Sequence, residues 1–245
     1  MLAVEEEASI APDGVDPRRV TRAFQQWVLP AGKGALDQLE VRVEERFKAV
    51  SALPDTSPTD LPGSWEAWLA GVLSARPYQS ALLRETRWVE VGRTLQEARA
   101  GRHGARDLPE LSTRLRGAPP GVCLDAMADL LHSAAPDRIP LLPRWVFNPA
   151  QGTGVLNEFA RSPPRSYEEA QAWTGAIRLQ LSALGFPSRT FAAVDLLFSL
   201  TYAGRIAHAA SETFQGGGIE TLLPGNLGLA TLLLGIRGRR SDAHR

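Results

Sequence analysis

The stretch SYEEAQAWTGAIRLQLSALG, residues 166–185, indicates most clearly what kind of fold this sequence forms. Its apolar side chains recur every three or four residues, which is the spacing of one face of a helix. Ser166 and Glu169 form a capping box, in which the hydroxyl accepts from a free backbone N–H and the carboxylate reaches back to another. Gly185 is a typical helix end. We therefore predict a helix over this stretch with one buried face.

The same periodicity extends over most of the chain. Further helices are predicted over 16–29, 34–52, 65–75, 78–100, 121–133, 189–214 and 226–236. No Asn-Gly or Asp-Gly turn separates two alternating runs, so nothing indicates a β-hairpin. We predict an all-α fold, an irregular helical bundle.

Three proline-rich or glycine-rich segments interrupt the predicted helices. Residues 53–64 form a loop, and residues 135–154 are apolar enough to pack as an irregular loop. A break at 101–119 suggests two helical lobes, residues 1–100 and 119–245, or one continuous domain.

Composition excludes several classes of protein. The 245 residues carry 27 basic and 27 acidic side chains, so no overall positive field exists for coating nucleic acid or anionic membrane. A single cysteine, Cys123, excludes an intrachain disulfide and a multi-cysteine metal site. The acidic start lacks the features of a secretory signal. The longest apolar run, 227–236, is shorter than the ~20 residues of a membrane span. We expect a cytoplasmic protein that does not bind membranes.

The run at the C-terminus predicts a structural helix. Residues 226–236 are apolar on nearly every side, and Asn226 is a plausible cap. A helix of this kind must be buried, either in the core of its own chain or across an oligomer interface. Glycines 216–218 form a hinge that permits both arrangements, and we expect the arginine-rich tail after the helix to lie in solvent.

The sequence contains no Walker loop, His-Glu-x-x-His or Gly-x-Ser-x-Gly motif. We therefore expect no cofactor and no enzyme of a familiar class. One alternative is a metal-dependent enzyme that uses Asp125, Asp129 and His132. Their i, i+4, i+7 spacing places them on one helix face, and carboxylates with an imidazole can bind a divalent metal. Because this face lies opposite an apolar stripe, we expect it to face water, and a solvated polar surface is then the simpler interpretation.

Arginines provide the other candidate site. Eight arginines and five acids between residues 84 and 116 leave a local charge of +3. A patch of this kind suits DNA or RNA, although alternating Glu and Arg also form surface ion pairs. The candidate nucleic-acid-binding residues are Arg102, Arg106, Arg114, Arg116, Gly121, Arg144 and Trp145.

Three further side chains have two interpretations each. Trp145 and Phe147 lie in the loop 135–154, where they either stack on a base or fasten the loop to the core. Asp195 lies within an apolar helix, where a carboxylate needs a partner such as an arginine; it is either in a structural ion pair or an active-site acid.

Two segments resemble a known family. PPGVCLDAMADLLHSAAPDRIPLLPRWVF, residues 119–147, resembles the helix-hairpin-helix region of the DNA glycosylase superfamily through Pro120-Gly121-Val122 and the apolar helix that follows. FAAVDLLFSLTY, residues 191–202, resembles the closing helix of glycosylase-like domains in bacterial restriction and defence proteins.

The resemblance implies a helix-hairpin-helix fold, but this sequence departs from the family at the positions that carry its chemistry. Cys123 replaces the second hairpin glycine, Asp125 stands where bifunctional members have lysine, and residues 142–144 lack the family's catalytic aspartate. The property that the resemblance still implies is phosphate binding, by a hairpin that uses main-chain N–H groups rather than side chains.

These observations favour a non-catalytic helical binding module, an accessory subunit of a bacterial nucleic-acid-processing or defence assembly. The alternatives are a protein–protein scaffold that binds no nucleic acid, and the metal-dependent enzyme. We expect at least one protein partner, DNA or RNA bound through a local arginine patch, and an oligomer as one possible assembly.

Overall fold

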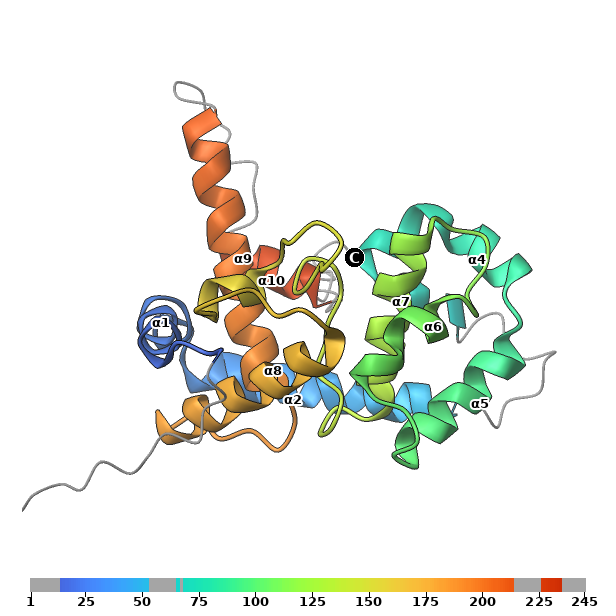
Figure 1. Ribbon diagram of the computed structural model, residues 1–245, viewed down its shortest axis with the longest axis horizontal. Coiled ribbons are helices and arrows are strands. Elements are labelled where there is room, and N and C mark those ends of the chain that lie inside the picture. The colour runs from blue at the N-terminus through green and yellow to red at the C-terminus, as the bar shows by residue number, and fades with distance from the viewer. Residues whose placement is uncertain (1–13, 53–64, 67, 214–225, 235–245) are drawn as a thin grey trace, which may run out of the picture.

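The computed structural model describes residues 14–52, 65–66, 68–213 and 226–234. Over these residues the chain is helical and contains no β-strand, only the isolated bridges Val15–Ala160 and Asn148–Thr153. The predicted all-α fold is confirmed (Figure 1). In chain order the helical elements are α1 (Pro17–Ala23), η1 (Phe24–Val28), α2 (Leu29–Ala52), η3 (Leu73–Tyr78), α4 (Gln79–Glu85), α5 (Trp88–Arg99), η4 (Ala105–Asp107), α6 (Leu108–Ser112), α7 (Pro120–Ala134), η5 (Val155–Phe159), α8 (Tyr167–Ala183), α9 (Ala192–Thr213) and α10 (Asn226–Leu233).

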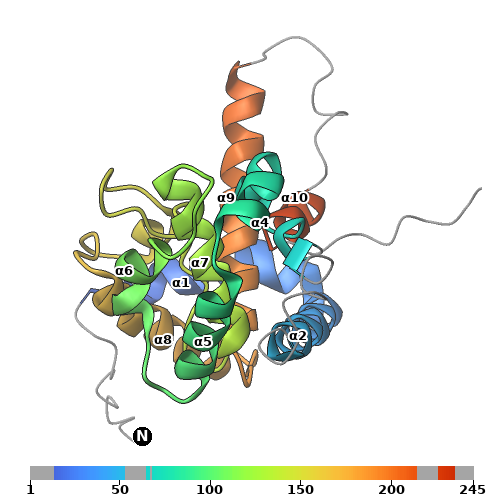
Figure 2. The ribbon, with the colours of Figure 1, turned by 90° about the vertical axis from the view of Figure 1, so that its right-hand side faces the viewer.

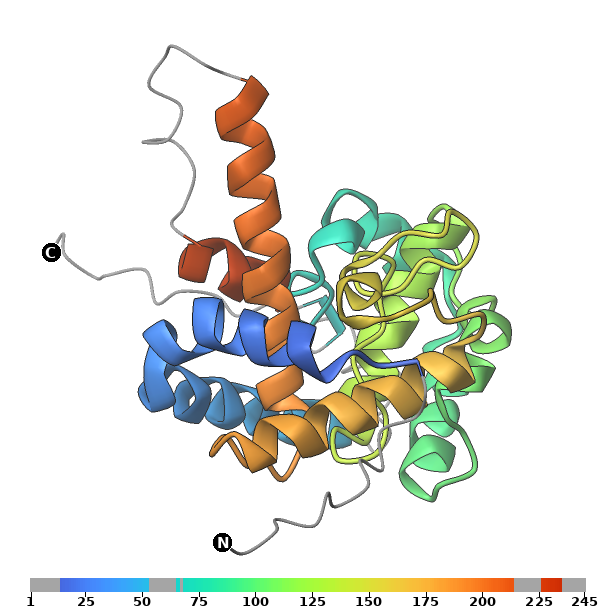
Figure 3. The same cartoon turned by 60° about the vertical axis from the view of Figure 1, so that its left-hand side comes forward.

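The first helices follow the predicted boundaries. Asp16 caps α1 by accepting from the N–H of Arg18 at 3.0 Å, and η1 continues α1 as a turn of π-helix. Gly32, with φ +77°, is non-helical and separates the two predicted helices. Only glycine adopts this conformation readily. The chain therefore reverses at Gly32, and α2 runs back alongside α1 (Figure 3).

Between residues 65 and 100 the structure differs from the prediction. Residues 73–78 form a 3₁₀ helix with Pro77 inside it, whereas one α-helix was expected to end at residue 75 and the next to begin at residue 78. Proline has no N–H to donate within an α-helix. The long helix predicted over 78–100 is divided into α4 and α5 at Thr86, whose hydroxyl binds both the N–H and the carbonyl of Arg116. The short helix α6, within the predicted break, was not anticipated.

Helix α7 lies at the centre of one side of the molecule. It contacts α2, α5, α6 and η3, and nearly every side chain along it is buried (Figure 2). The sequence places Cys123 on the apolar face of the helix predicted over 121–133 and so predicts that it lies in the core, which its exposed fraction of 4% confirms. Burial raises the pKa of its thiol.

Helix α9 is the centre of the other side. It contacts α2, α8, η1 and α10, and its C-terminal part extends beyond the remaining helices (Figure 1). Helix α10 packs directly on α9, with Ala230 fully buried and Leu234 5% exposed. The C-terminal helix is therefore structural and packs within its own chain. Three predictions fall outside the part of the chain that the structure describes: the cap formed by the Asn226 side chain, the hinge 216–218 and the basic tail.

The two halves of the sequence share a core. Helix α1 contacts α8, and η1 contacts α9. The buried apolar side chains form one cluster from Val15 to Leu234 that draws on both sides of the seam at 101–119. Within the described part of the chain, no helix has the length and apolar character needed to cross a membrane.

Candidate binding cleft

The polar face of α7 does not face water, contrary to the sequence-based expectation. Asp125, Asp129 and His132 are 7%, 7% and 6% exposed. Other elements cover most of the helix, so its polar face is largely buried as well as its apolar stripe. Buried charges require partners, and each of these three side chains has a different one.

Asp125 binds Arg144. Its Oδ1 accepts from the main-chain N–H of Arg144 at 2.8 Å and from Nε at 3.2 Å, and its Oδ2 accepts from Nη2 at 2.8 Å. This bidentate ion pair holds the guanidinium plane in one orientation. Because the Arg144 side chain is 41% exposed, the pair presents a fixed arginine to the solvent.

Gly121 makes room for this arginine. The guanidinium of Arg144 lies across the first turn of α7, and a Cβ added to Gly121 would lie 2.5 Å from Cζ and 2.9 Å from Nε. These positions are closer than any real contact, so a side chain at residue 121 would displace the guanidinium. Two of the predicted site residues are thus in direct contact.

Asp129 forms a second ion pair, with Arg46 of α2. Its Oδ1 also accepts from Trp68 Nε1 at 3.1 Å. Arg46 in turn donates through Nη1 to the carbonyl of Leu234 at the end of α10, at 2.7 Å. Arg46 therefore joins α2, α7 and α10, a role that sequence reasoning missed. A signal was present, because Arg46 interrupts the apolar stripe of α2 between Val43 and Val50.

His132 pairs with Asp195 of α9, across 3.3 Å between Nε2 and Oδ2. Asp195 was expected to need a partner, and the partner is this histidine rather than an arginine. The Nδ1 of His132 lies 2.8 Å from the carbonyl of Ile139. Since a carbonyl only accepts, Nδ1 carries a hydrogen, and Nε2 is the ring nitrogen that faces Asp195.

Burial and charge together set the protonation of this pair. Burial alone lowers the pKa of His132, but the carboxylate of Asp195, with help from the Ile139 carbonyl and Asp129, outweighs it and raises the pKa above its usual value. Burial raises the pKa of Asp195, against the opposing effects of His132 and Arg46. The folded protein therefore retains protons on this pair to higher pH than the separate groups would.

The three polar residues of α7 do not converge on a common point. Asp125 faces Arg144, Asp129 faces Arg46 and Trp68, and His132 faces Asp195. In the described ranges no three His, Cys, Asp or Glu side chains are arranged to hold a metal ion.

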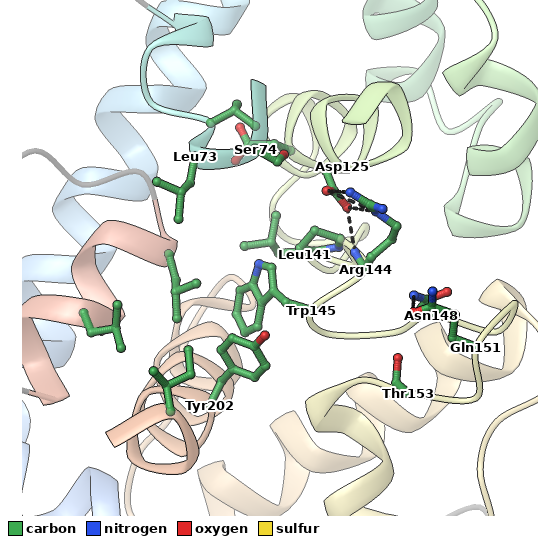
Figure 4. A pocket seen from close by; sticks show the side chains of 16 residues that line it. Leu73, Ser74, Asp125, Leu141, Arg144, Trp145, Asn148, Gln151, Thr153 and Tyr202 are labelled. Carbon is green, nitrogen blue, oxygen red and sulfur yellow. Dashed lines mark hydrogen bonds and ion pairs between the residues drawn. The ribbon is translucent and has the colours of Figure 1, made fainter. Parts of the chain in front are cut away.

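A cleft of about 470 Å³ opens beside this buried polar centre. Its volume lies within the range of small-molecule sites. Figure 4 shows Trp145 and Tyr202 pointing into it, with Asp125 and Arg144 at one end. The lining residues come from η3, α7, α9, α10 and the loop 135–154, and are Val72, Leu73, Ser74, Asp125, Asp129, Leu141, Pro143, Arg144, Trp145, Asn148, Gln151, Thr153, Tyr202, Ile206, Leu229 and Leu233.

The two loop aromatics have different roles. Phe147 is 2% exposed and anchors the loop 135–154 in the core. Trp145 is only partly buried and lies beside Tyr202 of α9, with 5.5 Å between ring centroids and 44° between ring planes. Tyr202 was not predicted as a site residue, although it lies seven residues after Asp195 and so on nearly the same helix face.

The remaining candidate arginines lie elsewhere. Arg102 and Arg106 line a separate hollow with Arg138. Arg114 donates to the hydroxyl of Thr94, and the main chain of Arg116 is bonded to Thr86. Of the seven predicted residues, the structure brings together Gly121, Arg144 and Trp145.

Comparison with protein-family models, with curated proteins and with solved structures finds no match to this chain. The resemblance to the helix-hairpin-helix family therefore stays a prediction. The segment 119–147 comprises α7, with Pro120 at its first position, and the irregular loop that follows, so Pro120, Gly121 and Val122 form the first turn of α7.

Proposed function

We propose that this chain is a non-catalytic binding module that captures an unpaired nucleotide of DNA or RNA in its cleft. It would do so as an accessory subunit of a nucleic-acid-processing or defence assembly. The observation that carries the proposal is the aromatic pair Trp145 and Tyr202, which lies on the wall of a cleft with Arg144 at its end.

Stacking is the main source of affinity in this proposal. Each base that stacks on an aromatic side chain contributes about 1–3 kcal/mol, whatever its identity. The neighbouring cleft walls are apolar, from Leu141 on the loop to Leu229 and Leu233 on α10. A planar base with two weakly hydrated faces fits such walls better than a charged ligand does.

Arg144 supplies a contact for the phosphate. Asp125 engages the main-chain N–H, Nε and Nη2 of Arg144, and Nη1 has no hydrogen-bond partner among the described residues. A guanidinium held on one side by a carboxylate presents its remaining N–H groups in a fixed direction, here beside the first turn of α7. This arrangement suits a phosphate oxygen.

The carboxylates at the cleft support binding rather than proton transfer. Asp125 and Asp129 are each paired with an arginine. Each carboxylate accepts hydrogen bonds from its arginine and so holds the guanidinium in place.

Binding of a fluorescent single-stranded 12-mer, measured by anisotropy, tests the proposal. We expect Trp145→Ala to weaken binding by about 5- to 150-fold, the equivalent of one stacked base. Tyr78→Ala is the matched control, because Tyr78 is an exposed aromatic that does not line the cleft. Arg87→Ala, with a side chain 83% exposed, controls for loss of one surface arginine.

Salt dependence separates cleft binding from a broad arginine surface. One or two phosphate contacts give a slope of about 0.7–1.4 log units of affinity per log unit of salt on a single strand. The proposal is wrong if the wild-type protein binds no oligonucleotide at low salt, or if Trp145→Ala binds as tightly as the wild type. Failure to bind at low salt would favour the protein–protein scaffold.

A further inference from the structure

Charged side chains from α2, α7 and α9 meet inside the molecule. They act on one another and form a buried charge cluster, which consists of Arg46, Asp129, His132 and Asp195. With His132 protonated, the positive and negative charges of this cluster cancel. Loss of that proton leaves one uncompensated negative charge in the interior, which is costly unless a cation approaches it.

Asp195 is the carboxylate that loses its partner when this proton leaves. Its side chain is 2% exposed, and its Oδ2 makes no hydrogen bond to the described residues, although Nε2 of His132 lies 3.3 Å away. Neutral His132 keeps its hydrogen on Nδ1, toward the carbonyl of Ile139. Nε2 then turns a lone pair to the carboxylate, so Asp195 needs a different donor.

Arg46 is the cation best placed to become that donor. Arg46 and Asp195 border the same cavity, whose volume of about 20 Å³ is enough for one water molecule. The other arginine on this cavity, Arg42, is paired with Glu45 at the surface. Among the described residues, α8, η1 and α10, which also pack on α9, place no charged side chain on the cavity.

The present contacts of Arg46 hold one wall of the cleft. Arg46 pairs with Asp129, which lines the cleft, and donates to the carbonyl of Leu234 at 2.7 Å. Leu234 directly follows α10, and two leucines of that helix line the cleft. A shift of Arg46 toward Asp195 would release α10 and leave Asp129 without its cation.

We propose that protonation of the pair of His132 and Asp195 controls the cleft: Arg46 holds α10 in place while the pair is protonated, and turns to Asp195 when the proton leaves. This inference concerns the regulation of the proposed nucleotide site and rests on the proposed function. Oligonucleotide affinity then falls as pH rises, because the cleft loses a fixed apolar wall and gains the negative charge of Asp129. Since the pKa of His132 is raised in the folded protein, the fall begins above about pH 6.5.

Anisotropy of the single-stranded 12-mer at pH 6 and pH 9, with a dye that does not titrate in this range, measures the regulation. We expect the wild-type protein to bind more weakly at pH 9, by up to ~10-fold for each pH unit above the pKa of the pair. Asp195→Asn keeps the size of the side chain and removes the charge that attracts Arg46. Its affinity should be the same at both pH values, with thermal unfolding confirming that it folds.

Hydrogen exchange of α10 detects the same movement without nucleic acid. Protection factors correct for the intrinsic effect of pH on exchange. We expect the protection of α10 to fall between pH 6 and pH 9 by more than that of α8, which serves as the internal control. In Asp195→Asn the protection of α10 relative to α8 should not change with pH.

Two arginine variants separate the role of Arg46 from a general effect of charge. Arg46→Gln removes the contact with the Leu234 carbonyl, so α10 should be weakly protected at both pH values. Arg42→Gln is the matched control, because Arg42 lies one turn earlier on α2 and borders the same cavity. This variant should keep the pH dependence of the wild type.

The outcomes distinguish this inference from the proposed function. Equal affinity of the wild type for the 12-mer at pH 6 and pH 9 would overturn the inference, as would Asp195→Asn with the pH dependence of the wild type. Protection of α10 that falls no more than that of α8 would overturn it as well. If no oligonucleotide binds at either pH, the proposed function fails, and hydrogen exchange still decides whether the pair controls α10.

Discussion

At the scale of single residues, the first turn of α7 depends on the absence of a side chain. Gly121 lets the guanidinium of Arg144 lie against the helix, where it satisfies the buried Asp125. The same contact fixes the direction in which Arg144 meets solvent. A side chain at residue 121 is therefore expected to lower the stability of the protein by disturbing the ion pair between Asp125 and Arg144.

Replacing Gly121 by alanine tests this dependence. The new Cβ would displace the guanidinium, and Asp125 would lose its side-chain donors while keeping the Arg144 main-chain N–H. We expect the free energy of unfolding to fall by about 1–2 kcal/mol, measured by chemical denaturation. Gly175→Ala in α8 is the control, because no atom lies within 4 Å of its added Cβ, and it should stabilise the protein by about 0.5–1 kcal/mol. Equal effects at both positions would contradict the role of Gly121.

The buried pair of His132 and Asp195 predicts a pH dependence of stability. Both pKa values are raised in the folded state, so the folded protein binds more protons than the unfolded chain. The stabilisation from His132 is complete below its unfolded pKa, about 6.5. It is lost as pH rises from there through the folded pKa, at up to about 1.4 kcal/mol per pH unit for each proton. Asp195 acts in the same direction from its own unfolded pKa upward.

Thermal unfolding between pH 6 and pH 9 measures this effect, and Tm should fall with rising pH. The double variant His132→Asn, Asp195→Asn removes both titrating groups, while the amide of residue 132 can still donate to the Ile139 carbonyl. Its Tm should vary less with pH than that of the wild type. Parallel pH profiles for the two proteins would show that another group is responsible.

At the scale of elements, the ends of the helices are set by local chemistry. Ser166 Oγ accepts from the N–H of Glu169 at 3.1 Å, as the capping box predicts. The Glu169 carboxylate reaches back one residue further than expected, to the N–H of Arg165 at 2.7 Å. Gly185, with φ +88°, follows the end of α8. Helix α8 therefore starts and stops where the sequence indicates.

Removing the cap of α8 should have a measurable cost. Ser166→Ala deletes the acceptor for an otherwise unpaired N–H and should lower the free energy of unfolding by about 1 kcal/mol. Ser182→Ala, at an exposed position of the same helix, should be neutral or slightly stabilising. If chemical denaturation gives the same value for both variants, the cap does not contribute to stability.

Helix α10 is held by its contacts with α9 and by Arg46. Truncation after Gly218 would remove the buried Ala230 and Leu234 and the two leucines that line the cleft. Burial of each large apolar side chain is worth about 1.5–3 kcal/mol. The truncated protein should therefore unfold at a lower temperature or aggregate, as differential scanning calorimetry and size-exclusion chromatography would show. A monomer with unchanged Tm would mean that α10 is dispensable.

At the scale of the whole molecule, the helices of the two halves complete one another. Helix α7 is covered by α2 and α5 from the first half, and α9 is covered by η1 and α2. The apolar cluster from Val15 to Leu234 spans both. The cleft also combines η3 from the first half with α7, α9 and α10 from the second.

Residues 1–100 and residues 119–245, expressed separately, should therefore not fold. Each fragment would expose the apolar faces that the other covers, and dye binding to exposed apolar surface should reveal this. The full chain should unfold in one transition, with tryptophan fluorescence and far-UV circular dichroism giving the same midpoint. A fragment that melts cooperatively by itself would contradict a shared core.

Much of the fold follows from the sequence because helix periodicity, caps and breaks are local. The helices that became α7, α8 and α9, the break near Gly32 and the burial of Cys123 all depend on residues a few positions apart. Thr86 also interrupts a predicted helix, but it acts through Arg116, 30 residues away. The missed division between α4 and α5 is thus a tertiary effect.

The environment of the candidate site could not be predicted from the sequence either, because it depends on contacts between residues far apart in the chain. Spacing alone placed Asp125, Asp129 and His132 on one face of a helix, and Trp145 was a candidate because it is an aromatic residue in the loop 135–154. Whether that face met water or protein was decided by partners distant in the sequence: Asp129 pairs with Arg46, 83 residues away, and His132 with Asp195 of another helix. A periodic pattern specifies which side chains share a face, whereas only the packed molecule specifies what covers that face.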